Sequence, residues 1–309
     1  MTRNSIMVTG ATGFVGRHLT SSLGAAYPDA QISLATADIT QADAISAEVR
    51  NVRPAFCIHL AGIAAVADAQ RVPSQAWQVN LHGTLNLAHA LRAHAPECLL
   101  IFASSADIYG ASFKSGRPAD EATLLSPLNT YAATKAAADL ALGAMAAEGL
   151  RCVRVRAFNH TGPGQSEAFV VSSFARQVAA IEAGLAEPVI RVGNLDPERD
   201  MLDVRDVCAA YIGCIAHADA LSPGSILNIA SGTPRRVGDI LVDLIKIAGL
   251  TGVAIETDVS RMRATDIPTA CGNSALAAQL LGWQPRIPWR KTLEDVLLSW
   301  RKHIADQPV

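Results

Sequence analysis

Three glycines stand close together where the first apolar segment of the chain gives way to a helical one. Ser5–Thr9 predicts a β-strand, and Gly13–Leu23 predicts the helix that follows it. Between them Gly10, Gly13 and Gly16 have the spacing G-x-x-G-x-x-G. A turn without side chains lets the backbone approach a pyrophosphate, and the helix N-terminus adds free N–H groups and the positive end of its dipole. The order strand, glycine turn, helix therefore predicts the dinucleotide site of an α/β fold.

Strand-like and helix-like segments alternate through the rest of the first half of the chain. This βαβ alternation predicts a doubly wound parallel sheet of the Rossmann type, with helices on both faces. Such sheets bind ligands beyond the carboxyl ends of their strands. The expected strands are Ile32–Leu34, Cys57–Leu60, Leu99–Ala103 and Cys152–Ala157, and the expected helices are Ala42–Arg50, Trp77–His94 and Thr130–Ala147.

After Phe158 the character of the sequence changes. A loop rich in glycine and proline at 160–166 is followed by helices and strands that do not form one more regular series. We expect residues 1–165 and about 204–231 to form the NAD(P)-binding domain, and about 166–203 and 232–309 a smaller, discontinuous α/β substrate lobe. The later elements expected are helices at Val170–Gly184, Val204–His217 and Val237–Ala248 and strands at Pro188–Val192, Ile226–Ala230 and Ala254–Glu256.

Charge and composition argue against several classes of partner. With 26 basic and 28 acidic residues and a net charge of -2, the chain gives no electrostatic reason to expect nucleic acid or an anionic membrane. No apolar run reaches the ~18–20 residues of a membrane helix, and Met1–Thr9 predicts a strand and not a signal peptide. The six cysteines include no C-x-x-C pair, so we expect no metal site, and reduced thiols in a cytoplasmic protein.

The adenosine end of the expected cofactor has two candidate residues. Asp38 lies beyond the glycine turn at a distance suited to hydrogen bonding with the adenosine half. It could equally belong to a helix N-cap, where Asp is common, and both roles can coexist. No acidic residue ends the strand-like segment 32–36, so the usual reader of the ribose 2′-hydroxyl is missing, and Arg17 could meet a 2′-phosphate. These observations favour NADP(H) slightly over NAD(H).

Tyr131 and Lys135 are four residues apart on a predicted helix and therefore share a face. A phenol with a pKa near ~10 is a poor acid–base catalyst, and a neighbouring ammonium group lowers that pKa by favouring the phenolate. The hydroxyl of Ser105, just beyond the expected strand at 99–103, could hold a substrate oxygen against Tyr131. The Y-x-x-x-K spacing alone is common on helices, but here it follows a glycine turn and a strand that ends in serines.

Taken together, these motifs resemble the extended short-chain dehydrogenase/reductase family over nearly the whole chain. The matching segments include T-G-A-T-G-F-V-G at 9–16, H-L-A-G at 59–62, S-S-A-D-I-Y-G at 104–110 and R-A-F-N-H-T-G-P-G-Q at 156–165. Two narrower segments, at 169–177 and 193–206, are similar to the GDP-mannose branch of that family. Within that branch, the similarity is greatest to the reductases of 4-keto sugars.

The resemblance implies roles for individual residues. Ser105, Tyr131 and Lys135 would be the catalytic triad, and Asn80 would support the active-site helix. Arg199 and Arg263 would bind the nucleotide diphosphate, because guanidinium suits bidentate phosphate recognition, although solvated surface arginines are the alternative. The cofactor residues would be Gly10, Thr12, Gly13, Phe14, Val15, Gly16, Arg17, Asp38, Ile39, Leu60, Ala61, Gly62, Asn80, Ala103, Tyr131, Lys135 and Phe158, and the substrate residues Ser105, Asp107, Asn159, Arg199, Arg263 and Asp266.

The resemblance also implies a reaction, which departures from the family pattern help to define. The related 4,6-dehydratases carry a threonine and a glutamate where this chain has Ser105 and Asp107, and a frequent family proline is Ala157 here. We therefore expect NAD(P)H-dependent reduction of the 4-keto group of GDP-4-dehydro-6-deoxy-D-mannose to GDP-D-rhamnose. A GDP-mannose 4,6-dehydratase is disfavoured but stays open, as do a nucleotide-sugar 4-epimerase and a cofactor-binding protein without catalysis.

A homodimer is the expected assembly. Family members usually pair through helices like those at 77–94 and 130–147, which form a four-helix bundle. The small residues around Ala136, Ala137, Leu140 and Ala144 would allow close helix approach. Packing of the same face within one chain is the alternative.

Overall fold

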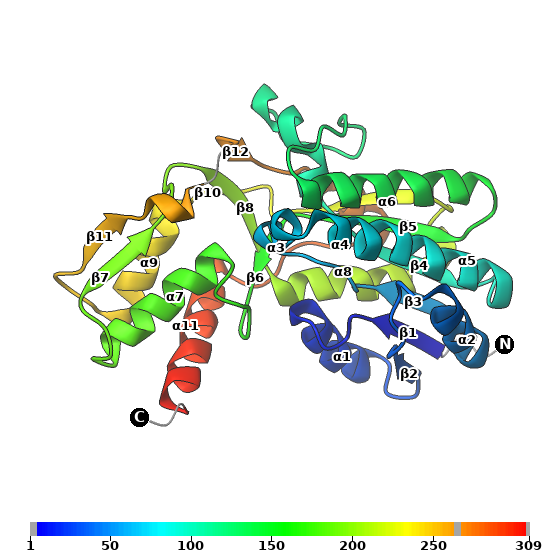
Figure 1. Cartoon of the computed structure of the whole chain (residues 1–309), viewed down its shortest axis with the longest axis horizontal. Coiled ribbons are helices and arrows are strands. Elements are labelled where there is room, and N and C mark those ends of the chain that lie inside the picture. The colour runs from blue at the N-terminus through cyan, green and yellow to red at the C-terminus, as the bar shows by residue number, and fades with distance from the viewer. Residues whose placement is uncertain (1–4, 263–266, 307–309) are drawn as a thin grey trace.

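Six parallel strands form the central sheet of the larger lobe, in the order β2-β1-β3-β4-β5-β9 (Figure 1). The computed structural model describes residues 5–262 and 267–306. The strand order reverses between β1 and β3, so the carboxyl ends of these two strands mark a ligand-binding crevice. The predicted parallel sheet is confirmed, with β1 (Ser5–Thr9), β2 (Gln31–Leu34), β3 (Phe56–His59), β4 (Leu99–Ser105), β5 (Cys152–Ala157) and β9 (Ser225–Ile229).

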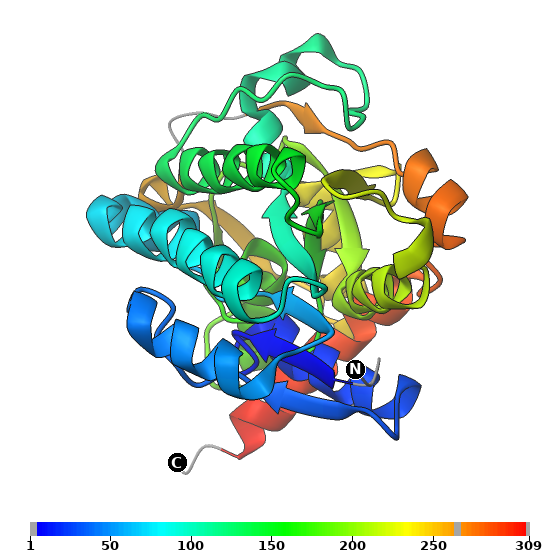
Figure 2. The same cartoon turned by 90° about the vertical axis from the view of Figure 1, so that its right-hand side faces the viewer.

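Helices cover both faces of this sheet, as Figure 2 shows end-on. Because side chains alternate along a strand, Ile6 and Val8 of β1 enter the core on one face and Met7 enters the core on the other. The first face is covered by α1 (Phe14–Ala26) and α8 (Val204–Ala216). The second face is covered by α2 (Ala42–Val52), α5 (Thr84–His94) and α6 (Thr130–Ala147).

The helical region predicted at Trp77–His94 is confirmed, but it is not a single regular helix. It follows α3 (Val66–Arg71) and consists of α4 (Pro73–Trp77), a π-helical stretch η1 (Gln78–Gly83) and α5. π-Helical turns inside α-helices are rare and frequent at functional sites. This one contains Asn80, a residue of the predicted site.

The smaller lobe packs three helices against short strands. α7 (Val170–Glu182), α9 (Val237–Ala248) and α11 (Trp289–Ala305) share one apolar core. β7 (Val189–Val192) pairs with β11 (Ala254–Thr257), and β8 (Glu198–Asp203) pairs with β6 (Asn159–Thr161), β10 (Pro234–Arg236) and β12 (Thr269–Ala270).

One segment packs with the opposite lobe to the one predicted. Ala277 and Leu281 of α10 (Ala275–Leu281), together with Trp283, lie in the apolar core beneath α8. The indole N–H of Trp283 donates to the Asp206 carbonyl at 2.9 Å. The assignment of all of 232–309 to the substrate lobe is therefore wrong at 275–283, because these apolar side chains complete the core of the dinucleotide lobe.

A protruding segment follows the active-site strand. The 3₁₀ element η2 (Ala106–Ser115) bends at Gly110, whose φ of 48° is left-handed. A β-carbon there would clash with the Ser126 carbonyl, so only glycine fits this bend. The remaining short elements are η3 (Ala218–Ala220) and η4 (Val259–Arg261). Within 5–262 and 267–306, every helix is too short or too polar to cross a bilayer.

Candidate active site

The glycine turn has the shape that a pyrophosphate requires. Gly10 has a φ of 71°, and a β-carbon on it would lie 2.6 Å from the amide nitrogen of Ala61. A β-carbon on Gly16 would clash with the carbonyl of Gly10, so the helix can approach the turn only without a side chain. The N-cap of α1 is Gly13, with no capping side chain, which leaves the first N–H groups of the helix for a ligand.

The other residues predicted at this turn lie around the same crevice. Thr12 and Gly13 are exposed, Phe14 and Val15 are half-buried, and the Phe14 ring stacks on His160 at 6.3 Å between centroids. Leu60, Ala61 and Gly62 follow β3 directly, and Ala103 lies in β4, so all four belong to the edge where the strands end.

Arg17 joins the two lobes. Its guanidinium donates to the Thr12 carbonyl at 2.7 Å and to the Gly164 carbonyl at 3.1 Å. These contacts tie the dinucleotide turn to the loop after β6. Its role towards a 2′-phosphate stays a prediction.

At the adenosine end, the structure adds a carboxylate that the sequence analysis missed. Asp38 is exposed and accepts hydrogen bonds from the Thr40 amide at 2.9 Å and the Thr40 hydroxyl at 2.8 Å, which lower its pKa. The Ile39 side chain is buried in the core, so only its backbone can face a ligand. Glu48 of α2 accepts the amides of Thr36 at 3.0 Å and Ala37 at 2.9 Å, and thus places an acidic group at the end of β2. It was missed because it comes from the following helix and not from the strand.

Ser105 and Tyr131 meet although 25 residues separate them. Ser105 is the last residue of β4, and Tyr131 lies in the first turn of α6. The Ser105 hydroxyl is close enough to the phenol to lower the pKa of Tyr131, and its oxygen accepts the Asp107 amide at 3.2 Å. Asn129 begins α6 by accepting the Ala132 amide at 2.9 Å, which fixes the first turn. The structure therefore brings the serine and the phenol together at the strand edge that also carries the glycine turn.

Lys135 lies one turn further along α6, inside the protein. Its ammonium nitrogen is 4.4 Å from the centroid of the Phe102 ring. Burial lowers the pKa of Lys135 to about 8, and the carboxylate of Asp139 acts in the opposite direction. Lys135 thus remains a cation near neutral pH, although it loses its proton more easily than an ordinary lysine does.

The prediction that Lys135 lowers the pKa of Tyr131 is wrong for the chain by itself. Burial raises the pKa of Tyr131, the charge of Asp107 raises it further, and only the Ser105 hydrogen bond lowers it. The ammonium group of Lys135 lies over Phe102, and desolvation of the phenol outweighs any help from the cation. The consequence is that Tyr131 keeps its proton and can act as an acid.

A buried ion network supports the catalytic helix, and the sequence analysis missed it. Asp139 is completely buried and accepts the Ser104 hydroxyl at 2.7 Å, Nη2 of Arg156 at 2.8 Å and Nη1 of Arg154 at 3.1 Å. Arg156 also donates to the hydroxyl of Tyr109 at 3.1 Å. A signal was present: two arginines alternate with valines in β5, and one aspartate interrupts an apolar helix. Removal of one partner would leave buried charges unpaired.

Two residues predicted to contact the cofactor have other tasks. The amide group of Asn80 is engaged by Ile63 and by the Thr134 hydroxyl, so its side chain supports α6, as the resemblance implied, and its contact with the cofactor stays a prediction. Phe158 is buried in an aromatic cluster, its amide donates to Ile229, and its carbonyl binds His160.

Two of the predicted substrate residues lie on paired strands of the smaller lobe. Asn159 is exposed on β6, which pairs with β8, the strand of Arg199. Nη1 of Arg199 donates to the carbonyls of Glu198 at 2.8 Å and Ile267 at 2.7 Å. Asp107 interacts electrostatically with Tyr131 and so belongs to the site. Arg263 and Asp266 lie outside the described residues.

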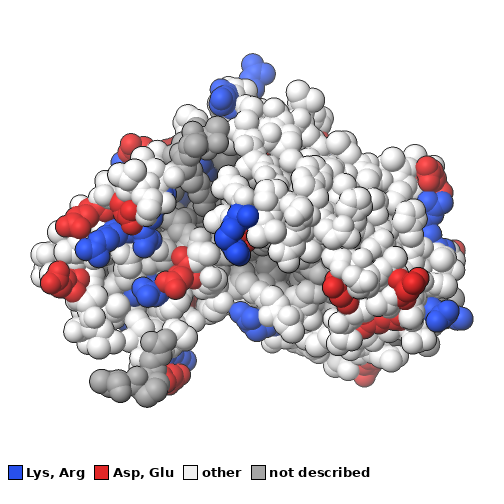
Figure 3. All heavy atoms as spheres, in the orientation of Figure 1, with Lys and Arg blue, Asp and Glu red and all other residues white. Residues whose placement is uncertain are grey.

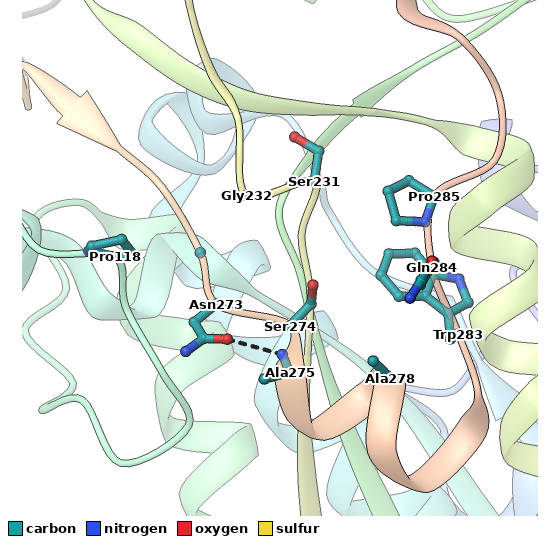
Figure 4. Close-up of a pocket in the computed structure, with 11 residues that line it drawn as sticks. Pro118, Ser231, Gly232, Asn273, Ser274, Ala275, Ala278, Trp283, Gln284 and Pro285 are labelled. Carbon is teal, nitrogen blue, oxygen red and sulfur yellow. Dashed lines mark hydrogen bonds between the residues drawn. The ribbon is translucent and has the colours of Figure 1, made fainter.

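A separate hollow contains none of the predicted site residues (Figure 4). It has a volume of about 490 Å³, and its lining carries no charged side chain. One wall is Ser231 and Gly232, whose amides donate to the buried Asp200 at 2.8 Å and 2.9 Å. The hollow thus lies beside the connection that leads from β9 into the smaller lobe.

Comparison with known proteins decides the family. A protein-family model described as GDP-mannose 4,6 dehydratase matches residues 23–296. The chain belongs to this family. It is an NAD(P)-dependent enzyme of the extended short-chain dehydrogenase/reductase type, as the motifs predicted.

Individual relatives agree over the full length. The chain is 35% identical over 305 residues to a GDP-6-deoxy-D-mannose reductase of Pseudomonas aeruginosa, covering 98% of this chain and 99% of that protein. It is 28% identical to a UDP-glucose 4-epimerase of Corynebacterium glutamicum, covering 98% and 97%. A solved structure of RMD from Pseudomonas aeruginosa complexed with NADPH superposes with a TM-score of 0.88 at 34% identity, covering 97% and 99%.

Proposed function

We propose that this enzyme reduces the 4-keto group of GDP-4-dehydro-6-deoxy-D-mannose with NAD(P)H and produces GDP-D-rhamnose. The observation that carries the proposal is that Ser105, at the end of β4, and Tyr131, in the first turn of α6, meet closely enough for the serine to lower the pKa of the phenol, at the sheet edge that also carries the glycine turn. It occurs in a chain that matches a GDP-6-deoxy-D-mannose reductase from end to end. The GDP half of the substrate would bind Asn159, Arg199, Arg263 and Asp266.

The residues of the chain suit a reduction. When bound, the reduced nicotinamide supplies a hydride to C4 of the sugar. Ser105 donates a hydrogen bond to the carbonyl oxygen and orients it towards Tyr131. As that oxygen gains negative charge, Tyr131 transfers its phenolic proton to it, and its raised pKa ensures that the proton is present beforehand. Lys135, one helical turn further along α6, would hold the ribose of the bound nicotinamide with its ammonium group.

The test is a direct assay. Purified protein is supplied with the keto sugar and either NADPH or NADH, and the oxidation of the cofactor is followed by absorbance. The configuration at C4 of the product is determined by NMR, because hydride delivery to the other face would give the talose isomer. If neither cofactor is oxidised at any practical protein concentration, the reductase proposal is rejected.

A 4,6-dehydratase is the second candidate, for two reasons. The family model carries that description, and the carboxylate of Asp107 acts on Tyr131, close to where the related dehydratases have an acidic residue. A dehydratase would convert GDP-mannose to the keto sugar without added NADPH. Incubation with GDP-mannose alone, followed by NMR of the nucleotide sugar, separates this activity from the reductase.

NADPH is the proposed preferred cofactor, by a small margin. β2 and the residues directly after it contain no acidic side chain, and a relative of known structure is in complex with NADPH. Glu48 acts against this preference, since its carboxylate at the end of β2 would repel a 2′-phosphate. Comparison of kcat/KM for NADPH and NADH in the native enzyme and in Glu48→Gln measures both effects.

We further propose a cytoplasmic homodimer that pairs through α5 and α6. The two ionised residues of α6, Lys135 and Asp139, are buried, and its outer side presents Leu140, which is 58% exposed. Figure 3 shows a broad uncharged area over this part of the larger lobe. A Leu140→Glu variant should be a monomer by light scattering where the native protein is a dimer, and a native monomer would reject this arrangement.

A further inference from the structure

A row of buried hydrogen bonds runs through the larger lobe, from the strand before the glycine turn to the first turn of α6. It lies behind the site described above and is not part of it. Each side chain in the row is at most 1% exposed, so water does not provide alternative partners. The members are Thr9, His59, Thr84, Asn80 and Thr134.

The hydrogen positions on one side of the row follow from the chemistry of each group. The Thr84 hydroxyl has one hydrogen and donates it to the carbonyl of Asn80 at 2.8 Å. The same oxygen is 3.0 Å from Nε2 of His59, so it accepts there and Nε2 carries a hydrogen. In a neutral imidazole Nδ1 is then bare, and it accepts the Thr9 hydroxyl at 2.6 Å.

The environment of His59 keeps the ring neutral. Burial, together with the smaller effect of the charge of Lys135, lowers the pKa of His59 to about 3. The ring lies 5.9 Å from Phe102, the same ring that carries the Lys135 ammonium on its face. A second cation at His59 would therefore be close to Lys135 in a medium that screens charge poorly.

The other side of the row reaches the catalytic tyrosine. Asn80 donates from Nδ2 to the Thr134 hydroxyl at 3.0 Å, and Thr134 donates its hydrogen to the Tyr131 carbonyl at 2.8 Å. Asn80 is also fixed to the segment after β3 through the amide of Ile63 at 2.8 Å. The first turn of α6 is thus held at Thr134, three residues from the phenol.

We propose that His59, as its neutral Nε2–H tautomer, is a positioning residue that acts through Thr84 and Asn80. It fixes Tyr131 relative to the dinucleotide turn without touching the substrate or the cofactor. The proposal depends on the proposed function only because it takes Tyr131 to be the acid. The tautomer of His59 and the position of the Tyr131 phenol can both be measured without any substrate.

The first experiment determines the tautomer. Long-range 1H–15N NMR on 15N-histidine-labelled protein separates the two neutral tautomers and the cation, and the His59 signals among the 8 histidines are identified by their loss in His59→Gln. We expect the Nε2–H form at neutral pH. A hydrogen on Nδ1, or a doubly protonated ring, would overturn the proposal.

The second experiment interrupts the row at Thr84. Thr84→Val removes the hydroxyl at nearly constant volume, Thr84→Ser keeps it, and Thr20→Val is the matched control. Thr20 has the same hydrogen bond to the carbonyl four residues earlier, at 2.7 Å to Gly16, but stands outside the row. With 3-fluorotyrosine at the 4 tyrosines, the Tyr131 resonance, assigned by Tyr131→Phe, should shift in Thr84→Val alone.

Turnover provides the second readout of the same variants. We expect Thr84→Val to lower kcat about tenfold, with KM for sugar and cofactor little changed, because small misplacements of a catalytic group are costly. Thr84→Ser should restore kcat. An unshifted Tyr131 resonance in folded Thr84→Val, or a kcat equal to that of Thr20→Val, would overturn the positioning role. If the native enzyme does not turn over the keto sugar, the proposed function fails, whereas the tautomer and the fluorine shift still decide this inference.

Discussion

The two halves of the active-site region differ in how their polar groups are held. Around α6, Asp139 and Asn80 are buried and fully engaged by partners within the chain. On the proposed substrate side, Asn159 is exposed, and Arg199 is half-buried and donates to the backbone carbonyls of Glu198 and Ile267. One half is held by partners within the chain, whereas the other half would present its groups to the proposed substrate.

This difference separates chemistry from recognition. A proton donor must stand within hydrogen-bonding distance of one substrate atom, so rigid support increases the rate. A nucleotide diphosphate is large and charged, and arginine side chains can bind it without fixing the reacting atom. Substitutions in the first half should therefore change kcat or stability, and those in the second half should change KM.

The largest expected effect comes from the phenol. Tyr131→Phe removes the proton donor, so kcat should fall about 10³- to 10⁴-fold. The affinity for NADPH, measured by fluorescence titration, should stay within a factor of about three, because the glycine turn is untouched. Turnover at native rates would refute the role of Tyr131 as the acid.

Acid stability is the next largest effect. The pKa of His59 is about 3 in the folded protein and 6.5 for an unperturbed histidine, so the unfolded chain binds a proton that the folded chain does not. Stability should be complete above about pH 6.5 and decline as the pH falls from there towards 3, by about 3 kcal/mol at pH 4. Urea unfolding as a function of pH measures this decline.

The control for that experiment is a pair of histidine variants. His59→Gln should show a shallower decline than the native protein, although it is less stable at neutral pH. His217→Gln, at an exposed histidine, should keep the native slope. Equal slopes in all three proteins would show that His59 is protonated in the folded state.

The sequence predicted those parts of this site that are encoded by local spacing. Gly10, Gly13 and Gly16 form the turn, and Tyr131 and Lys135 share one helix, because both patterns depend only on short-range geometry. Their partners could not be derived in the same way. The Asp139–Arg156 ion pair depends on how α6 crosses the sheet, and the pattern of apolar residues along the sequence does not contain that information.

The same reasoning explains the errors. The effect of Lys135 on Tyr131 was inferred from spacing, whereas the pKa of a buried phenol depends on desolvation and on Asp107, both of which are consequences of tertiary packing. The segment 275–283 was assigned to the substrate lobe by its position after β9, but apolar side chains pack where a core has room for them. Motif spacing thus identifies functional groups more reliably than it identifies their surroundings.

A medium effect is expected on the recognition side. Arg199→Ala should raise KM for the GDP-sugar about 10- to 100-fold, the loss expected for a charge-assisted hydrogen bond, with kcat changed less than about threefold. Arg236→Ala on the neighbouring strand β10 is the control, since Arg236 forms its ion pair with Asp196 at the surface. If Arg199→Ala instead lowered kcat and left KM unchanged, the proposed division between a catalytic half and a substrate-binding half would be wrong.

The smallest effect on turnover is expected from a change at Asp107, which belongs to both the catalytic half and the proposed substrate half. Asp107 follows the catalytic serine, and its charge raises the pKa of Tyr131. The variant Asp107→Asn removes that negative charge, so the pKa of the Tyr131 phenol should fall. Because reduction requires the protonated phenol, the alkaline limb of the kcat/KM profile that Tyr131 sets, which lies above the ionisation of Lys135 at a pKa of about 8, should move to lower pH, with less than about a tenfold loss at neutral pH. Asp43→Asn, at an exposed carboxylate in the first turn of α2, should leave the profile unchanged. A limb that moves to higher pH would mean that Asp107 acts on Tyr131 through its hydrogen bonds and not through its charge.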